Sequence, residues 1–180
     1  MGLLLPVWHW SRSKMLKLHN SYSNNVEEFR PDSNSVKVYL CGPTVQSSPH
    51  IGHGRSAVVF DFLIRYLKFS NYQVTFVRNI TDIEDKIIQR SEEEGITTEE
   101  LADRVTKEFQ KSYADLNCLL PNHEPKATDT IDHIIYLIEL LIDKGYAYST
   151  KSGVYFEVGK FENYLNPVSY THLTLPTTSM

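Results

Sequence analysis

The sequence predicts an α/β protein with a parallel sheet, because two strand-like segments flank one long helical segment. Residues 36–41 (VKVYLC) and 73–78 (QVTFVR) are rich in the β-branched and aromatic residues typical of strands. Between them, residues 51–69 carry an apolar pattern with a helical period. A strand, a helix and a second strand within about 45 residues form a crossover unit, which joins parallel neighbours. The 41% hydrophobic content of the 180-residue chain can supply the core of such a domain.

The first strand and the helix after it have clear limits. Gly42-Pro43 ends the strand, and a polar loop leads to the helix. The helix at 51–69 is apolar around most of its circumference, so we expect it to be buried on most sides. Its polar face is formed by Asp61, Arg65 and Lys68.

A polar turn and a second long helix follow the second strand. The turn is NITDIEDK, residues 79–86. The helix is predicted from about residue 98 to residue 116, because Thr97 and Glu100 have the spacing of a capping box and an apolar stripe follows them.

The part of the chain after residue 120 has the pattern of a helix and a hairpin. A proline-containing break at 121–125 precedes a predicted helix at 131–144, which Gly145 ends. Two aromatic runs, 146–148 and 154–158, then predict a β-hairpin.

Composition and charge restrict the classes of function. With 18 Lys plus Arg against 22 Asp plus Glu, the net charge of −4 excludes a bulk nucleic-acid binder. No apolar run is long enough to span a bilayer, which excludes a membrane protein. Two widely separated cysteines, Cys41 and Cys118, indicate free thiols in a reducing compartment. We therefore expect a cytoplasmic protein, with the mitochondrial matrix as the less favoured alternative.

The segment with the strongest chemical pattern is CGPTVQSSPHIGHGR, residues 41–55, at the junction of the first strand and the first helix. Ligands of open α/β sheets bind at this carboxyl edge. His50 and His53 bring imidazole N–H donors, and Gly52 and Gly54 allow a ligand to approach the backbone where helix N–H groups attract anions. The combination suits a nucleoside triphosphate. In the alternative interpretation, both histidines only cap the helix.

These residues resemble a known family. His50-Ile51-Gly52-His53 is similar to the His-Ile-Gly-His element of the class I aminoacyl-tRNA synthetases. The longer strings YLCGPTVQSSPHIGHGR and FVRNITDIEDKII resemble the cysteinyl-tRNA synthetase family, and the resemblance runs from about residue 15 to about residue 164. It implies activation of L-cysteine by ATP, with Mg²⁺ carried on the ATP, followed by transfer of cysteine to tRNA(Cys).

The resemblance also implies roles for individual residues. His50 and His53 would stabilise the triphosphate in the transition state, with Gly52 and Gly54 at the ATP-binding backbone. Cys41 would be one ligand of a Zn²⁺ ion that binds the substrate thiolate, whereas the alternative from sequence alone is a small buried hydrophobe. The amino-acid pocket would be lined by Gly42, Thr44 and Thr81, with Asp82 beside them. We interpret the acids of the turn, Asp82, Glu84 and Asp85, as solvated rather than as a magnesium cluster, and Cys118 as a core residue.

The resemblance further implies a domain organisation. Residues 15–120 would form the first half of a Rossmann-like catalytic domain, and 121–167 the start of an inserted α+β connective domain. Residues 1–14 are a doubtful leader, with Met15 as an alternative start. Residues 168–180 are rich in threonine and serine, carry no charge and are interpreted as a tail foreign to the protein.

Two other functions stay open at this point. One is an ATP-dependent ligase that joins cysteine to an aminosugar, as in mycothiol synthesis, and the other is a non-catalytic nucleotide- or cysteine-binding fragment. The sequence lacks the Lys-Met-Ser-Lys-Ser-type loop that clamps the pyrophosphate side of ATP in the family. We therefore expect the chain to be the N-terminal portion of the enzyme, with the remaining zinc ligands and most tRNA-binding parts farther on, and to have little adenylation activity alone.

Overall fold

The computed structural model describes residues 16–21 and 23–161, which form two units. The larger unit spans residues 31–156 and the smaller one contains the described residues on either side of it. The predicted leader, 1–14, and tail, 168–180, lie outside the described residues.

The smaller unit contains a hairpin that the sequence analysis did not predict. Strands β1 (Lys17–Asn20) and β2 (Asn25–Glu28) pair antiparallel. The Asn20 side-chain amide donates to Glu27 at 3.0 Å. A single turn of 3₁₀ helix, η2 (Val158–Lys160), belongs to the same unit.

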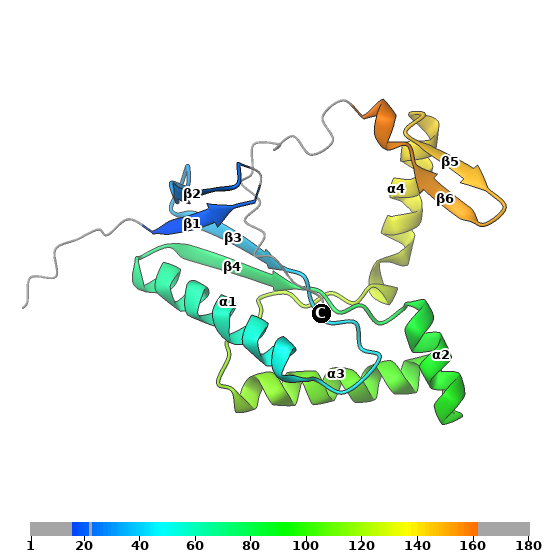
Figure 1. Cartoon of the computed structure of the whole chain (residues 1–180), viewed down its shortest axis with the longest axis horizontal. Helices are drawn as coiled ribbons and strands as arrows, with labels where there is room; N and C mark the ends of the chain where they lie inside the picture. Colours follow the sequence, from blue (N-terminus) through cyan, green and yellow to red (C-terminus); the bar gives the residue numbers. More distant parts are fainter. Residues whose placement is uncertain (1–15, 22, 162–180) are drawn as a thin grey trace, which may run out of the picture. The chain divides into compact units, whose positions relative to one another are not determined.

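The centre of the larger unit is the predicted parallel crossover. Strands β3 (Ser35–Leu40) and β4 (Gln73–Arg78) pair in parallel, from Ser35 opposite Gln73 to Leu40 opposite Arg78. Helix α1 (Ile51–Phe69) joins them and packs against β4 (Figure 1). The α/β class and the parallel pairing are confirmed.

A third extended segment lies along the other edge of β4. His123 forms a parallel bridge with Val77 of β4. Lys126 forms a second one with Ile80, just after the end of β4. The amide of Ile80 donates to the carbonyl oxygen of Pro125 at 2.9 Å. Because a proline at the edge of a sheet can still accept through its carbonyl, the proline-containing break is part of the sheet. The domain boundary expected there stays a prediction.

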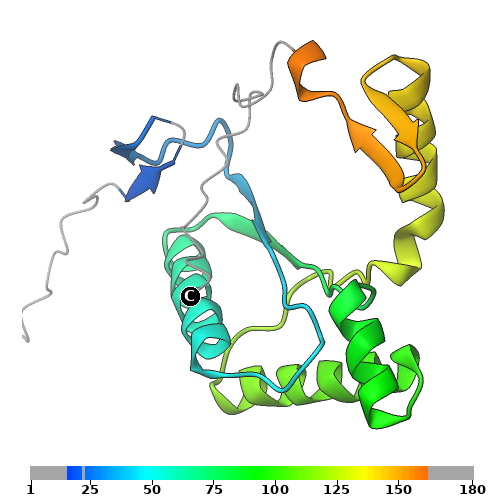
Figure 2. The same ribbon diagram turned by 45° about the vertical axis from the view of Figure 1, so that its right-hand side comes forward.

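Two helices follow β4, where the sequence analysis predicted one. Helix α2 (Asp85–Glu94) begins inside the supposed polar turn, with Glu84 as N-cap accepting from the Lys86 amide at 2.9 Å. Helix α3 (Thr98–Asp115) has the predicted capping box between Thr97 and Glu100. The two helices pack against each other (Figure 2).

The buried side chains form two clusters around the crossover. One lies between α3, α2, the start of α1 and the loops after both strands, and Cys118 packs against it as predicted. Its buried members are Val45, Ala57, Ile80, Ile87, Leu101, Ala102, Val105, Phe109 and Tyr113. The second joins α1 to the sheet through Leu40, Phe60, Ile64 and Phe76.

The prediction that the first helix is buried on most sides is wrong for the described residues. Val58, Val59 and Phe62 of α1 are exposed, and Phe62 keeps 73% of its surface. Only one stripe of the helix, Ala57, Phe60, Ile64 and Leu67, is buried.

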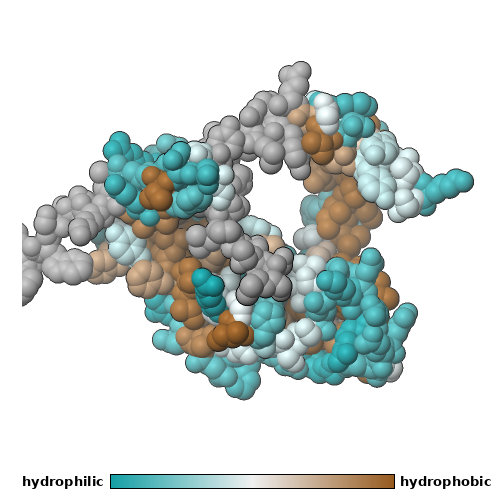
Figure 3. Space-filling view, in the orientation of Figure 1, coloured by the Kyte–Doolittle hydropathy of each residue, from teal (hydrophilic) through white to brown (hydrophobic). Residues whose placement is uncertain are grey.

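The last described elements of the larger unit are the predicted helix and hairpin. Helix α4 (Ile131–Asp143) ends before Gly145, whose φ of +75° suits glycine. Strands β5 (Ala147–Thr150) and β6 (Gly153–Phe156) pair antiparallel, and Tyr148 stacks on Tyr155. Figure 3 shows apolar side chains along α4; the exposed ones are Ile131, Ile134, Ile135, Tyr136, Leu137 and Ile142. No described helix is long and apolar enough to cross a membrane.

Candidate functional site

The two predicted pocket threonines come together where the parallel strands end. Thr44 follows β3 and Thr81 follows β4, and they form a parallel bridge. The Thr81 amide donates to the carbonyl oxygen of Pro43 at 3.0 Å, and the Val45 amide donates to that of Thr81 at 3.1 Å. Both threonines are half-buried at the carboxyl edge, the position at which α/β sheets bind ligands.

Gly42 lies in the tightest part of this edge. A Cβ added to Gly42 would lie 1.5 Å from the backbone carbonyl oxygen of Asn79. Its amide donates to the side-chain oxygen of Asn79 at 2.8 Å. Only glycine fits this close to the Asn79 backbone, so packing alone requires glycine at position 42. The role of Gly42 at a ligand site stays a prediction.

The two histidines cap the N-terminus of α1 reciprocally. His50 is the N-cap residue, and its Nδ1 accepts from the Gly52 amide at 3.1 Å. The Nδ1 of His53 accepts from the His50 amide at 3.2 Å. The ring centroids are 3.9 Å apart. The structure thus shows the capping that the alternative interpretation expected. The nucleotide-binding interpretation stays a prediction, because the capping uses one nitrogen of each ring and leaves the other.

The capping bonds fix the proton position of each neutral ring. An imidazole nitrogen that accepts a hydrogen bond carries no proton, so the proton is on Nε2. Within the described part of the chain, no residue bonds to either Nε2 atom. Both rings can therefore donate an Nε2–H to a phosphate oxygen.

His53 is held in its neutral form by its surroundings. Its ring lies edge-on to Phe109 of α3, with the centroids 4.8 Å apart. Burial lowers the pKa of His53 below its ordinary value of 6.5, and the neighbouring His50 lowers that pKa further. At neutral pH His53 is a hydrogen-bond donor without a charge.

Removing the imidazole of His50 is expected to raise the pKa of His53. In the His50→Gln variant the like charge disappears, while burial against Phe109 persists, so the pKa should rise but stay below 6.5. An NMR titration of the His53 ring protons measures the change. His133→Gln, on exposed α4, is the matched control and should leave the His53 titration unchanged. An unchanged or lowered pKa in His50→Gln would contradict the described coupling.

The two glycines of the motif lie against neighbouring side chains. A Cβ on Gly52 would be 2.9 Å from Cε1 of His50, so a larger residue would push the ring out of its capping position. A Cβ on Gly54 would be 3.2 Å from a methyl carbon of Leu116, just after α3. Gly52 thus serves the histidine pair, and Gly54 allows α1 to approach the end of α3.

Cys41 is exposed directly after β3, with a free thiol. This position contradicts the alternative that Cys41 is a small buried hydrophobe. Among residues 16–21 and 23–161, no group of three or more His, Cys, Asp or Glu side chains could hold a metal ion. These residues do not make up a zinc site by themselves.

The acids of the predicted polar turn differ in their surroundings. Asp82 is buried, which contradicts its interpretation as a solvated acid. Its carboxylate accepts from the amide of Thr128 at 3.0 Å and from the Thr128 hydroxyl. Glu84 caps α2, and Asp85 lies in its first turn, where a negative charge complements the helix dipole. Asp82 and Glu84 therefore have structural partners, whereas Asp85 is exposed, as its interpretation as a solvated acid expects.

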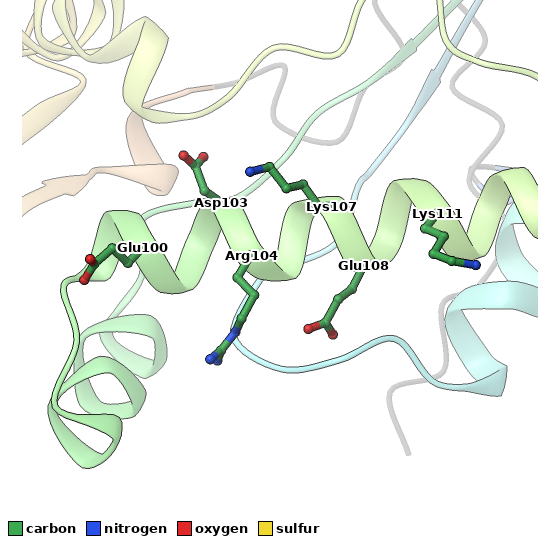
Figure 4. A pocket seen from close by; sticks show the side chains of 6 residues that line it. All are labelled: Glu100, Asp103, Arg104, Lys107, Glu108 and Lys111. Atoms are coloured by element: carbon green, nitrogen blue, oxygen red, sulfur yellow. The ribbon is translucent and has the colours of Figure 1, made fainter.

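A shallow hollow on α3 lies apart from the chemistry described above. Figure 4 shows its six charged side chains, with Asp103 and Lys107 on one side of the helix and Arg104 and Glu108 on another. Asp103 pairs with Lys126 and Arg104 with Glu94. Alternating and mostly paired charges are typical of a solvated helix face.

The predicted site residues thus form two groups on one loop and the strand end beside it. The first is the histidine pair with Gly52 and Gly54, and the second is Cys41, Gly42, Thr44 and Thr81. No hydrogen bond joins the two groups within the described residues. Two further residues contact these groups and were not predicted: Asn79 contacts the second group, and Phe109 contacts the first. Asn79 lies inside the quoted NITDIEDK string, whereas nothing in the local sequence marks Phe109.

Comparisons with known proteins show which family the chain resembles. The family model described as the catalytic domain of class I (C) tRNA synthetases matches residues 28–174. A cysteine–tRNA ligase of Pseudomonas syringae is 48% identical over 152 residues, 83% of this chain and 33% of the relative. A Methanococcus maripaludis cysteine–tRNA ligase is 49% identical over 151 residues, covering 83% of this chain and 32% of that protein. The chain spans about a third of the length of these relatives.

Proposed function

The chain belongs to the class I (C) tRNA synthetase family, and on that premise we propose that the protein activates L-cysteine with ATP and transfers it to tRNA(Cys). In the first step the cysteine carboxylate attacks the α-phosphorus of ATP. The bond to the bridging oxygen breaks, pyrophosphate leaves and cysteinyl adenylate forms. A hydroxyl of the terminal tRNA ribose then displaces AMP.

The histidine pair at the start of α1 is the observation that carries this proposal. Negative charge on the phosphoryl oxygens shifts toward the leaving pyrophosphate during the attack. The Nε2–H groups of His50 and His53 would donate to these oxygens, and the backbone N–H groups at the helix start, opened by Gly52 and Gly54, would add to the attraction. Because the caps already orient both rings, little reorganisation is required at the moment of reaction.

The strand ends would hold the amino acid. We place L-cysteine against Gly42, Thr44 and Thr81, which the structure describes at one sheet edge. Cys41, exposed beside them, is our candidate for one ligand of the zinc ion implied by the family; the other ligands would come from outside the described residues. Mg²⁺ would arrive on the ATP phosphates. We place the protein in the cytoplasm, where tRNA and ATP are available.

Tests at His53 separate its capping role from its proposed donor role. Asparagine can accept from the His50 amide as Nδ1 does, but it lacks a donor at the position of Nε2. In the protein expressed from its whole gene, His53→Asn is expected to lower the rate of cysteine-dependent pyrophosphate exchange about 100-fold, with a smaller change in the KM for cysteine. His53→Gln, which carries an amide donor near the position of Nε2, should retain more of the rate.

Wild-type exchange rates in His53→Asn would overturn the role of His53. Absence of cysteine-dependent exchange in the wild-type protein would overturn the function itself. The relatives favour tRNA as the acceptor over an aminosugar, since those reported above are named as cysteine–tRNA ligases. Charging of tRNA(Cys) with radioactive cysteine, set beside an aminosugar acceptor, distinguishes the two.

A further inference from the structure

Asn79 lies where β3 and β4 lose their regular pairing. The regular register ends with Leu40 opposite Arg78, and the next bridge joins Thr44 to Thr81. Three residues on the β3 side therefore face two on the β4 side, as in a bulge. The extra residue leaves the amide of Gly42 to the Asn79 side chain instead of a backbone carbonyl.

The side-chain amide of Asn79 makes three hydrogen bonds across this mismatch. Its Oδ1 accepts from the Gly42 amide at 2.8 Å and from the Tyr39 hydroxyl at 2.9 Å. Its Nδ2 donates to the Thr81 hydroxyl oxygen at 3.2 Å. A backbone N–H can only donate, so the amide orientation is fixed. One side chain thus connects the residue after Cys41 to Thr81.

We propose that Asn79 is a positioning residue of the cysteine pocket, which sets Gly42 and the Thr81 hydroxyl relative to each other. The inference rests on the proposed function, because it takes these residues as the pocket. Asn79 is only partly buried, and its bonds lie at the strand ends, outside both apolar clusters. Its removal would loosen the pocket while leaving the packing of α1 and α3 in place.

Asn122, in the extended segment after α3, offers a matched control because it bonds to β4. Its Oδ1 accepts from the amide of Phe76 at 2.7 Å, as that of Asn79 does from Gly42. Asn122→Ala therefore removes a comparable bond between an asparagine and a backbone amide, three residues before Asn79 in the register of β4. If cysteine binding weakens in both variants, the cause is general weakening of the sheet. If it weakens only in Asn79→Ala, the cause is a change in the pocket.

The test measures pyrophosphate exchange by the protein expressed from its whole gene. Asn79→Ala is expected to raise the KM for cysteine about 10-fold, while the KM for ATP changes less than about 2-fold. Asn122→Ala should leave both KM values within about 2-fold of the wild-type values. Its loss of thermal stability should be similar to that of Asn79→Ala. Asn79→Asp keeps an acceptor for Gly42 and lets the Thr81 hydroxyl become the donor, so the KM for cysteine should return most of the way to the wild-type value.

Equal changes in the KM for cysteine in Asn79→Ala and Asn122→Ala would overturn the proposal, as would a parallel rise for cysteine and ATP. If Asn79→Ala does not fold, Asn79→Asp decides: a KM for cysteine no better than 10-fold above the wild type overturns the proposal. An inactive wild type instead contradicts the proposed function. That outcome is distinct from an active wild type with an unaffected Asn79→Ala variant.

Discussion

Replacing Gly42 by alanine is expected to destabilise the 180-residue chain by about 3 kcal/mol and to eliminate cysteine activation by the protein expressed from its whole gene. The added Cβ would lie 1.5 Å from the carbonyl oxygen and 2.7 Å from the carbonyl carbon of Asn79. Both are backbone atoms beside paired strands, so no rotamer change relieves the clash. The strand ends would have to separate, which breaks the bond from Gly42 to the Asn79 side chain.

Urea unfolding of the chain, followed by circular dichroism, measures the effect on stability. Gly159→Ala is the matched control, because its added Cβ would meet only an ordinary contact, 3.8 Å from a carboxylate oxygen of Glu157. We expect the free energy of unfolding of Gly159→Ala to lie within about 0.5 kcal/mol of that of the wild type. A Gly42→Ala chain of wild-type stability would show that the sheet edge yields more easily than the described distances allow.

The crossover of β3, α1 and β4 was predictable because each element has a strong local pattern. Helix α2 was missed for the opposite reason. Its sequence, DKIIQRSEEE, is mostly charged and buries only Ile87 and Ser91, so it lacks a long apolar stripe. Its N-cap is Glu84, a residue type that the usual capping signals do not include. The hairpin of β1 and β2 is similarly short and exposed.

The edge segment after α3 shows a second limit of sequence reasoning. Pro121 and Pro125 predict a break, because proline disrupts helices and central strands. In the structure, carbonyl groups of this segment accept hydrogen bonds from the amides of Arg78 and Ile80. The Asn122 side chain accepts from the amide of Phe76. Which strand an extended segment will join depends on tertiary packing, and nothing in the local pattern encodes it.

The candidate site divides in the same way. Histidines and glycines at a strand-to-helix junction are identifiable from residue type and spacing, so the first group was predicted. The buried state of Asp82 was not, since its partner Thr128 lies 46 residues farther along the chain. Asn79 likewise acts on Gly42, 37 residues earlier. Such contacts form only when β3, β4 and the extended segment after α3 come together in the fold.

Replacing Glu124 by alanine is the second change with a large expected effect. The Arg78 side chain is only 4% exposed, and its guanidinium donates to Glu124 at 3.0 Å from Nε and at 2.6 Å from Nη2. The same guanidinium lies 4.3 Å above the ring of Tyr113. Without the carboxylate, a buried cation loses its partner, so we expect a loss of about 3 to 5 kcal/mol in the free energy of unfolding.

Asp115→Ala is the matched control for this loss. Asp115 pairs with Lys111 at 2.6 Å, but both side chains are more than half exposed. Water replaces such a pair readily, so Asp115→Ala should cost less than about 1 kcal/mol. Equal losses in Glu124→Ala and Asp115→Ala would mean that the ion pair of Arg78 is no more demanding than a surface pair.

Removing both charges together tests the cause of the effect. If the loss in Glu124→Ala comes from the unpaired buried guanidinium, replacing Arg78 as well should recover part of it. The double variant Arg78→Met with Glu124→Leu fills similar volume with apolar groups. We expect its free energy of unfolding to be at least about 1 kcal/mol higher than that of Glu124→Ala. Urea unfolding of the wild type, Glu124→Ala and the double variant gives the comparison. If the double variant is less stable than Glu124→Ala, the expectation is wrong. The ion pair itself would then stabilise this edge, because Glu124 connects Arg78 of β4 and Gln110 of α3 to the segment at 122–127.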